Sequence, residues 1–194
     1  MARRTRAEME QTRATLLQTA RQVFSERGYS ETSMDDLTAQ ASLTRGALYH
    51  HFGDKKGLLA AVVAQIDAEM DARLQAISDS ASDPWQGFSD RCRAYLQMAS
   101  EPEIQRIVLR DAPAVLGSPA PQAQLHCVAS LTSMLETLMA QGIVADADPQ
   151  ALASLISGGL TETALWIANV DGQSPRLEQA LAAMELLLKG LCRR

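Results

Sequence analysis

Apolar residues recur every three or four positions through almost the whole chain, which is the period of an amphipathic helix. Leu16, Ala20, Val23 and Phe24 form one such stripe. No long run alternates apolar and polar residues as a half-buried strand does. The pattern predicts an all-α protein of about nine helices, over residues 12–27, 34–41, 44–52, 55–77, 84–100, 102–111, 121–141, 149–169 and 175–191.

Small polar residues, glycines and prolines interrupt the helical pattern at several places. Gly28 and Gly53 follow predicted helices, and glycine is the residue that most often ends a helix. The sequence SDSASD over 78–83 predicts a loop. The stretch 111–121 is broken by glycine and proline, and we expect it to be irregular.

The segment 34–55 contains two short helical patterns separated by a tight break at 41–43. Ser33 precedes the first pattern and Asp36 lies three residues later, which is the arrangement of a capping box. Thr44 is placed to cap the second pattern. This is the outline of a helix-turn-helix, in which the first helix braces a second helix that enters a DNA groove.

The second short helix, 44–52, carries little apolar surface for its length. Leu48 and Phe52 lie one turn apart and are expected to pack inward. The remaining faces carry polar, aromatic or minimal side chains, namely Arg45, Gly46, Tyr49 and His50. Such a helix is expected to be exposed and available to a partner molecule.

From about Thr12 to Leu59 the chain resembles the DNA-binding domain of the TetR family of repressors. The resemblance rests on Leu17, Ala20, Phe24, Gly28, Tyr29, Thr32, Leu37, Ala41, Leu43, Gly46, Leu48, Tyr49, His51, Phe52, Lys55 and Leu58. One departure is Ser42, because the family usually has glycine in this turn. A left-handed conformation at a residue other than glycine costs about 1 kcal/mol, and we expect the turn to form nevertheless.

The resemblance implies two domains. Residues 1–54 would be the helix-turn-helix DNA-binding domain of three helices, with 1–10 as a flexible arm. The arm's arginines are compatible with phosphate or minor-groove contacts and equally with a solvated tail. Residues 55–194 would form a larger helical domain for effector binding and dimerisation, linked to the first by a rigid helix over about 55–77.

We predict a DNA-binding surface centred on the second short helix. Arg45 matches the O6 and N7 acceptors of guanine, although a purely phosphate contact is an equal alternative. Tyr49, His51 and Lys55 resemble family positions that contact phosphates. The full predicted set is Thr32, Ser33, Leu43, Thr44, Arg45, Gly46, Tyr49, His51 and Lys55.

The distribution of charge supports this placement. The net charge is −5, which alone argues against nucleic acid. Residues 1–60, however, hold nine basic and seven acidic residues, a net of +2, whereas the remainder holds nine and sixteen, a net of −7. A small basic region on an acidic protein suits a sequence-specific DNA-binding protein better than a non-specific one.

The last two predicted helices are apolar over more than half of their circumference. One face can meet the chain's own core, and the other requires a partner. The resemblance assigns these helices to a two-fold four-helix interface in a homodimer, and a fully intramolecular core is the alternative. The predicted interface residues are Leu152, Ile156, Gly159, Thr163, Leu177, Leu181, Met184 and Leu188.

An effector pocket is expected among the helices between 84 and 169. Its aliphatic and methionine-rich residues suit a hydrophobic or aromatic ligand. Arg106 and Arg110 lie one turn apart, where they could hold an anionic group or pair with Glu103 or Asp111. The candidate residues are Trp85, Tyr95, Met98, Arg106, Arg110, Met134, Glu162 and Trp166.

Other classes of function lack their motifs. No GxSxG, HExxH or phosphate loop occurs, so no enzyme activity is predicted. The three cysteines are widely spaced, which predicts reduced thiols and neither a metal site nor a cofactor. No apolar run approaches the length of a membrane span and no signal peptide is recognisable, so a cytoplasmic location is expected.

The prediction is a DNA-binding transcriptional regulator of the TetR type that represses from a near-palindromic operator and is released by a small molecule. Repression in particular is implied by the resemblance alone. The alternative is an architectural DNA-binding protein with the same helix-turn-helix and no effector.

Overall fold

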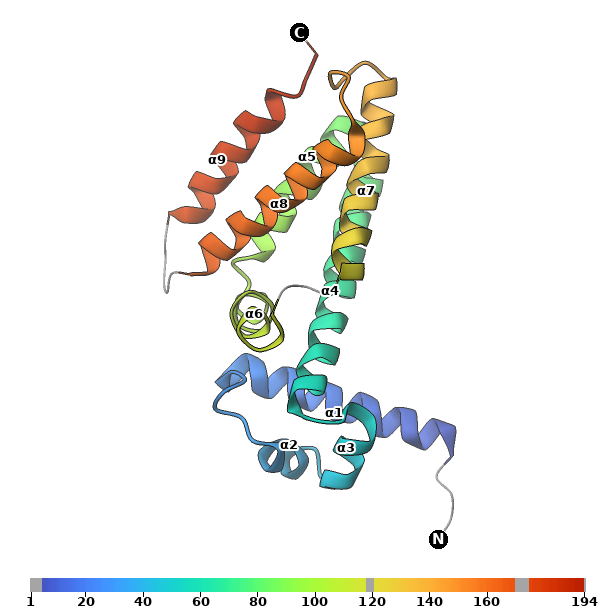
Figure 1. Ribbon diagram of the computed structural model, residues 1–194, viewed down its shortest axis with the longest axis vertical. Helices are drawn as coiled ribbons and strands as arrows, with labels where there is room; N and C mark the ends of the chain where they lie inside the picture. The colour runs from blue at the N-terminus through green and yellow to red at the C-terminus, as the bar shows by residue number, and fades with distance from the viewer. Residues whose placement is uncertain (1–4, 118–120, 170–174, 194) are drawn as a thin grey trace. The chain divides into compact units, whose positions relative to one another are not determined.

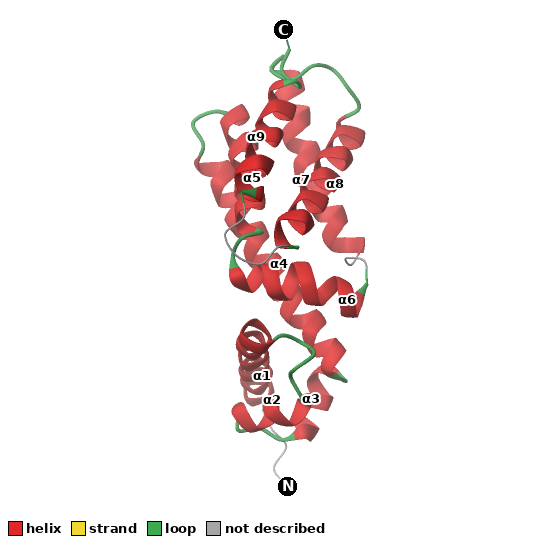
Figure 2. Cartoon of the chain, turned by 90° about the vertical axis from the view of Figure 1, so that its left-hand side faces the viewer, coloured by secondary structure: helices red, strands yellow, loops and turns green. Residues whose placement is uncertain are grey.

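A computed structural model of the 194-residue chain describes residues 5–117, 121–169 and 175–193, with the side chains of all of these except 121–125. Within these ranges the chain is helical and has no strand (Figures 1 and 2). The helices are α1 (Arg6–Arg27), α2 (Met34–Gln40), α3 (Arg45–Phe52), α4 (Lys55–Ser80), α5 (Pro84–Met98), the π-helix η1 (Ile104–Asp111), α6 (Ala112–Leu116), α7 (Pro121–Ala140), α8 (Pro149–Ala168) and α9 (Arg176–Lys189). The predicted all-α class is confirmed.

The chain forms two compact units. The first comprises Met1–Ile66 and Arg106–Gly117, and the second comprises Asp67–Gln105 and Ser118–Arg194. The division falls within α4, whereas the sequence placed a boundary at residue 54. The segment 106–117 belongs to the same unit as the helix-turn-helix, although it is distant in sequence.

The core of the first unit joins α1 to the two short helices. Figure 1 shows α2 and α3 side by side against α1, and all three pairs are in contact. The buried side chains are aliphatic apart from one phenylalanine, and each is at most 2% exposed: Leu16, Ala20, Val23, Phe24, Leu37, Leu48, Leu58, Leu59 and Val62. Helix α3 is anchored in this core by Leu48, and the other faces of α3 point away from the core.

Helix α1 begins earlier than the sequence predicted. Thr5 is its N-cap, and the Thr5 hydroxyl accepts a hydrogen bond from the backbone N–H of Glu8. The Glu8 carboxylate accepts in return from the N–H of Thr5, at 2.7 Å, which completes a capping box. The predicted flexible arm over 1–10 is therefore wrong for residues 6–10, and residues 1–4 lie outside the described residues.

The caps predicted at Ser33 and Thr44 agree with the structure, which adds caps at two further helices. Ser33 and Asp36 form a capping box at α2, and the side chains of Thr44, Asp83 and Asp148 cap α3, α5 and α8. Each cap satisfies N–H groups that the first turn of a helix leaves without a partner. These residues explain why the helix starts are well predicted from sequence.

Two stretches predicted as irregular are helical in part, and residues 118–120 of the second lie outside the described residues. Helix α4 continues to Ser80, so the predicted loop over 78–83 is shorter than expected. The stretch after η1 forms the short helix α6, with Pro113 in its first turn, where a missing N–H costs nothing. Gly117 then ends α6 with φ 84°.

The second unit is a bundle of α5, α7, α8 and α9 with the later turns of α4. Its tightest pairing joins α7 to α8. Its core is aliphatic with one buried phenylalanine, including Phe88, Leu96, Leu131, Leu135 and Leu138. The segment after α9 is attached to the α7–α8 connection, because Ala145 donates to the carbonyl of Leu191 and Arg193 donates to that of Ile143, each at 2.9 Å.

Candidate nucleic-acid interface and effector cavity

The turn between α2 and α3 is closed by a residue in the left-handed region. Ser42 has φ 53° and is the only such residue other than glycine in the described part of the chain. The N–H of Leu43 donates to the carbonyl of Thr38 at 2.9 Å and closes the turn. The expectation for Ser42 is confirmed, since the serine adopts the conformation for which glycine is better suited.

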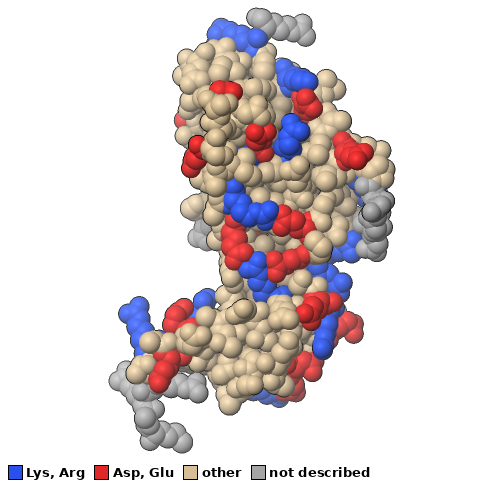
Figure 3. Space-filling view, turned by 180° about the vertical axis from the view of Figure 1, so that it is seen from behind, with Lys and Arg blue, Asp and Glu red and all other residues tan. Residues whose placement is uncertain are grey.

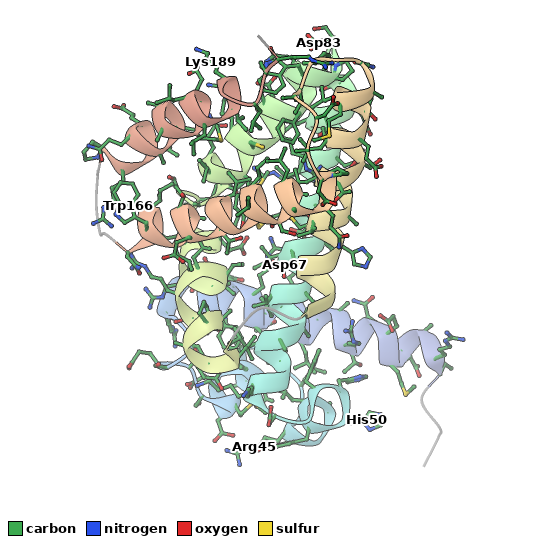
Figure 4. All side chains as sticks on the ribbon, turned by 45° about the horizontal axis from the view of Figure 1, so that its top comes forward. Arg45, His50, Asp67, Asp83, Trp166 and Lys189 are labelled. Carbon is green, nitrogen blue, oxygen red and sulfur yellow. The ribbon has the colours of Figure 1, made fainter. Side chains whose placement is uncertain are left out.

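Helix α3 presents a polar face to solvent. Leu48 is buried against α1 and α2, whereas Tyr49 is 51% exposed and Arg45, Gly46 and His50 are also exposed. Figure 4 shows Arg45 and His50 projecting outward from the helix-turn-helix. A side chain added at Gly46 would meet only the Thr44 hydroxyl, at 3.9 Å, so this face offers open space for close approach.

Arg45 is held by an acidic residue on the preceding helix. Its Nε and Nη2 donate to the two carboxylate oxygens of Asp35, in the parallel geometry that arginine forms with carboxylates. Both side chains are more than half exposed. This pair raises the pKa of Arg45 above its ordinary value, chiefly through the hydrogen bonds to Asp35. Asp35 therefore orients Arg45 and competes with any anionic partner for it.

The three predicted phosphate-contacting residues differ in accessibility. Tyr49 is open, while His51 is half-buried and its ring lies edge-on to His50. The ammonium of Lys55 lies over the ring of Tyr29 at 4.1 Å from its centre, a cation–π contact. Burial lowers the pKa of Lys55, and the nearby carboxylates of Asp111 and Glu31 oppose that shift.

Two members of the predicted DNA-binding set have structural roles. Thr32 is 2% exposed, and its hydroxyl donates to the carbonyl of Gly28 at 2.7 Å, so its side chain is not available to DNA. The hydroxyl of Ser33 is engaged by Asp36 in the α2 capping box, although Ser33 is exposed. The prediction for Thr32 is corrected, because its burial beside Gly28 was not evident from the sequence.

A glycine that the sequence analysis did not single out sets the distance between α3 and α4. A Cβ at Gly57 would lie 2.1 Å from the carbonyl oxygen of Phe52. The N–H of Gly57 also donates to the Asp54 carboxylate at 2.6 Å. Gly57 therefore permits the close turn that joins the exposed helix to α4.

The loop after α1 is bonded to η1, which accounts for the place of residues 106–111 in the first unit. Arg106 donates to the carbonyl of Arg27 at 2.7 Å. A Cβ on Gly28 would lie only 2.4 Å from Nη2 of this guanidinium, so a larger residue would clash with it. Gly28 has φ 83°, which also favours glycine. The N–H of Tyr29 donates to the Asp111 carboxylate at 2.8 Å.

Arg106 and Arg110 thus lie away from the predicted effector pocket. They line a polar depression of about 310 Å³ in the first unit, together with Arg27, Gly28, Ser30, Glu31 and Asp111. The prediction that these arginines share a pocket with the aromatic residues of α5 is corrected. Arg106 contacts the end of α1 and the loop that follows it, and Arg110 lines the same depression.

The second unit contains a small, mostly apolar cavity of about 10 Å³. Among the eight predicted pocket residues, only Tyr95 contributes to it. The cavity is lined by Leu74, Arg91, Cys92, Tyr95, Cys127, Leu131, Ser157 and Leu160. Arg91 was missed because nothing in the pattern of α5 indicates that a charged residue there is buried.

The other predicted pocket residues are dispersed. Met98 is 2% exposed and belongs to the core, and Trp85 packs against Phe88 with ring centres 6.1 Å apart. Met134 is half-buried on α7, and Glu162 is exposed on α8. Trp166 is 41% exposed, and the guanidinium of Arg176 lies 4.7 Å from its ring centre.

Comparisons with known proteins agree with this arrangement. The model described as "Bacterial regulatory proteins, tetR family" matches residues 16–62, and that described as "Tetracyclin repressor-like, C-terminal domain" matches residues 85–191, more than half of the chain. The chain belongs to the TetR family. It is a DNA-binding transcriptional regulator.

Solved structures and curated proteins show how far the similarity extends. A TetR-family transcriptional regulator from Pectobacterium atrosepticum is 72% identical, with 98% of this chain and 99% of that chain covered and a TM-score of 0.93. The transcriptional repressor BepR of Brucella suis is 32% identical over 107 residues, which is 55% of this chain and 51% of BepR. The TetC protein of transposon Tn10 from Escherichia coli is 24% identical over 169 residues, with 86% and 85% covered.

The last two helices of this TetR-family chain leave a large apolar surface open. Leu155 is 75% exposed, and Leu186 and Leu187 are 74% and 72% exposed. Side chains added at Gly158 or Gly159 would meet nothing within 4 Å. Among the described helices, α8 alone is long and apolar enough to cross a membrane, a property that core helices of soluble proteins share. Only 33% of its most apolar stretch is buried.

Two predicted interface residues do not belong to this open surface. Met184 and Leu188 are 9% and 5% exposed, because they pack into the core of their own unit. Leu152, Ile156, Thr163, Leu177 and Leu181 are half-buried, and Gly159 is exposed. The exposed apolar and glycine positions of α8 and α9 include Leu155, Gly158, Gly159, Trp166, Leu186 and Leu187.

The thiol of Cys92 is protected by its surroundings. Cys92 is buried, and burial raises the pKa of its thiol to about 12, so it remains protonated near neutral pH. In the part of the chain that the structure describes, no three metal-ligating side chains lie together. Acidic and basic side chains are interspersed on the face drawn in Figure 3.

Proposed function

We propose that this TetR-family regulator is a homodimeric repressor that leaves a near-palindromic operator when a small molecule binds its second unit. The observation that carries the proposal is the exposure of α3, with Leu48 buried behind it and Arg45 and Tyr49 in front. A helix held in this way can enter a major groove while its scaffold stays outside.

A second copy of the chain is the partner that best accounts for the open apolar surface on α8 and α9. Exposed apolar patches of this kind are unfavourable in a monomer and are typical of association sites. Gly158 and Gly159 would allow a partner helix to approach closely. A two-fold dimer would place two copies of α3 about one helical turn apart on DNA.

Arg45 is the proposed base-contacting residue. Its guanidinium lies in the first turn of α3, where recognition helices contact base edges, and Asp35 already holds it in a fixed orientation. On binding, guanine acceptors would replace the Asp35 carboxylate. Thr44, Gly46 and Tyr49 would contact or approach the phosphates beside it.

Release by a ligand is supported by a cavity in the second unit and by helix α4, which is continuous through both units. A ligand changes DNA affinity only if it binds one conformation more tightly than the other. The proposal therefore requires two conformations whose α3 helices differ in their fit to the operator. An architectural protein without an effector would lack this coupling.

The proposal is tested by DNA binding at graded salt with Arg45→Ala and, as a control, Lys56→Ala. Lys56 is exposed and lies outside α3. Wild-type protein should retain one promoter fragment at salt concentrations that remove random DNA. Arg45→Ala should lose about 1–3 kcal/mol of that preference. Lys56→Ala should weaken binding to promoter and random DNA by the same factor.

Two outcomes would contradict the proposal. If the wild-type protein bound promoter and random DNA with the same salt dependence, it would be an architectural protein. If Arg45→Ala kept the preference unchanged, Arg45 would not contact bases and would serve only as a phosphate contact or as the partner of Asp35.

A further inference from the structure

The cavity of the second unit is lined by a buried arginine, and one nitrogen of its guanidinium has no hydrogen-bond partner among the described residues. Arg91 is 5% exposed, and its Nη1 is buried with no hydrogen-bond acceptor among the described residues. Arginine does not lose its proton in proteins, so it cannot escape this cost by becoming neutral. A buried charge normally has a counter-charge beside it.

The neighbouring polar groups are also weakly satisfied. The hydroxyl of Tyr95 lies 3.5 Å from that of Thr161, which is at the limit of a hydrogen bond. The hydroxyl of Ser157 has only the sulfur of Cys127 as side-chain acceptor, at 3.7 Å. Arg91, Tyr95 and Ser157 are therefore three polar lining residues of one mostly apolar cavity, and the two hydroxyls make only long contacts that a better acceptor could replace.

No described carboxylate neutralises Arg91. Asp67 and Asp71 lie close enough to raise the pKa of Tyr95, but neither forms an ion pair with Arg91 in the described part of the chain. The remainder of the lining is apolar, with Leu74, Leu131 and Leu160. The lining thus combines one positive charge, neutral donors and an aliphatic wall.

We propose that this cavity binds the carboxylate group of a small organic anion whose remaining part is apolar. Arg91 would pair with the carboxylate, Tyr95 and Ser157 would donate to it, and the leucines would contact the apolar part. The inference rests on the proposed function, because it names the class of molecule that would act as effector.

The size of the cavity indicates how binding would couple to conformation. About 10 Å³ holds roughly one water-sized group. A carboxylate with an apolar substituent requires the lining side chains to move apart. The closed cavity and the occupied cavity would therefore differ in structure, as ligand-dependent release requires.

The first test concerns stability without any ligand. Arg91→Met replaces the guanidinium by an apolar chain of similar length and removes a charge that has no partner. Replacing such groups by apolar residues is often neutral or stabilising, so Tm should stay within about 2 °C of the wild type or rise. A fall of about 4 °C or more would mean that Arg91 has a structural role, and would overturn the proposal.

The second test measures binding of named probes by calorimetry on the full-length protein. The probes are butyrate, hexanoate, octanoate and benzoate, each compared with the corresponding alcohol, and with chloride and phosphate at equal ionic strength. At least one carboxylate should bind and its alcohol should not. Arg91→Met should lose about 30-fold or more of that affinity, and Arg91→Lys should retain part of it.

Arg93→Met is the matched control on the same helix. Arg93 is partly exposed and lies 3.8 Å from Asp90, so its loss should leave probe affinity unchanged. Failure of all four carboxylates, equal binding of acids and alcohols, or equal losses in Arg91→Met and Arg93→Met would each overturn the proposal. Preference for phosphate would assign the cavity to a different anion and would also overturn it.

These measurements use the protein without DNA. If no carboxylate bound but sequence-specific DNA binding was intact, the proposed class of ligand would be wrong and the proposed DNA-binding function would stand. Loss of sequence preference in the DNA experiment, with carboxylate binding intact, would instead remove the proposed function.

Discussion

Single residues determine the shape of the turn and the state of the cavity. Ser42 closes the helix-turn-helix at a cost that glycine would avoid, and Arg91 carries a charge without a described partner. Both features reduce the stability of the folded chain. Strained backbone and unpaired buried charge are more often found at functional sites than elsewhere.

Replacing Ser42 by glycine should stabilise the protein. The φ of 53° is unfavourable for serine, and the gain from relieving it exceeds the entropy that glycine adds to the unfolded chain. We expect the free energy of unfolding to rise by about 0.5–1 kcal/mol, measured by urea denaturation. Ser42→Ala is the control and should not stabilise, because alanine shares the steric penalty. A loss of stability in Ser42→Gly would contradict the assignment.

Asp67 predicts a specific pH dependence. Burial, with the like charge of Asp71, raises the pKa of Asp67 from 3.8 to about 6. A raised carboxyl pKa contributes stability that is present below about pH 4 and is lost as pH rises through 6. Asp67→Asn should therefore stabilise the protein at pH 8 by on the order of 1–2 kcal/mol, after allowance for partial exposure. The gain should vanish at pH 4.

The comparison is made by thermal unfolding of the wild type and Asp67→Asn across this pH range. Asp79→Asn, on the exposed end of α4, should show no such pH-dependent difference. A stability gain for Asp67→Asn that is equal at both pH values would contradict the cause assigned to Asp67, since it would not depend on titration.

At the scale of elements, most helix starts with a side-chain cap are predicted well from the sequence, and α1 is the exception. Ser33, Thr44, Asp83 and Asp148 bond locally to backbone N–H groups, so their effect is visible within four residues. The start of α1 was missed because the capping box at Thr5 lies within a charged segment.

The π-helix and α6 could not be predicted in the same way. A π-helix shifts the hydrogen-bond partner by one residue without a residue pattern of its own. The reason that η1 contacts the loop after α1 is tertiary, through Arg106 and Asp111. The burial of Arg91 and of Thr32 is tertiary too, so the cavity and part of the DNA-binding set were beyond sequence analysis.

For the whole molecule, the central claim is that two copies of α3 act together because α8 and α9 associate. Association would bury apolar side chains of α8 and α9 that are exposed in a single chain. Leu155 and Leu187 are exposed and lie on the two helices concerned. Placing a charge at each should oppose association without disturbing the core, since neither side chain is buried.

The most direct test is sedimentation velocity of the wild type and of Leu155→Glu/Leu187→Glu, alone and with the DNA fragment retained at high salt. We expect the wild type to be a dimer that binds as two chains per DNA fragment, and the variant to be a folded monomer that no longer binds the fragment. Gln97→Glu, at an exposed position of α5, should behave as the wild type. A wild-type monomer, or a double variant that remains dimeric and keeps the fragment, would contradict the account.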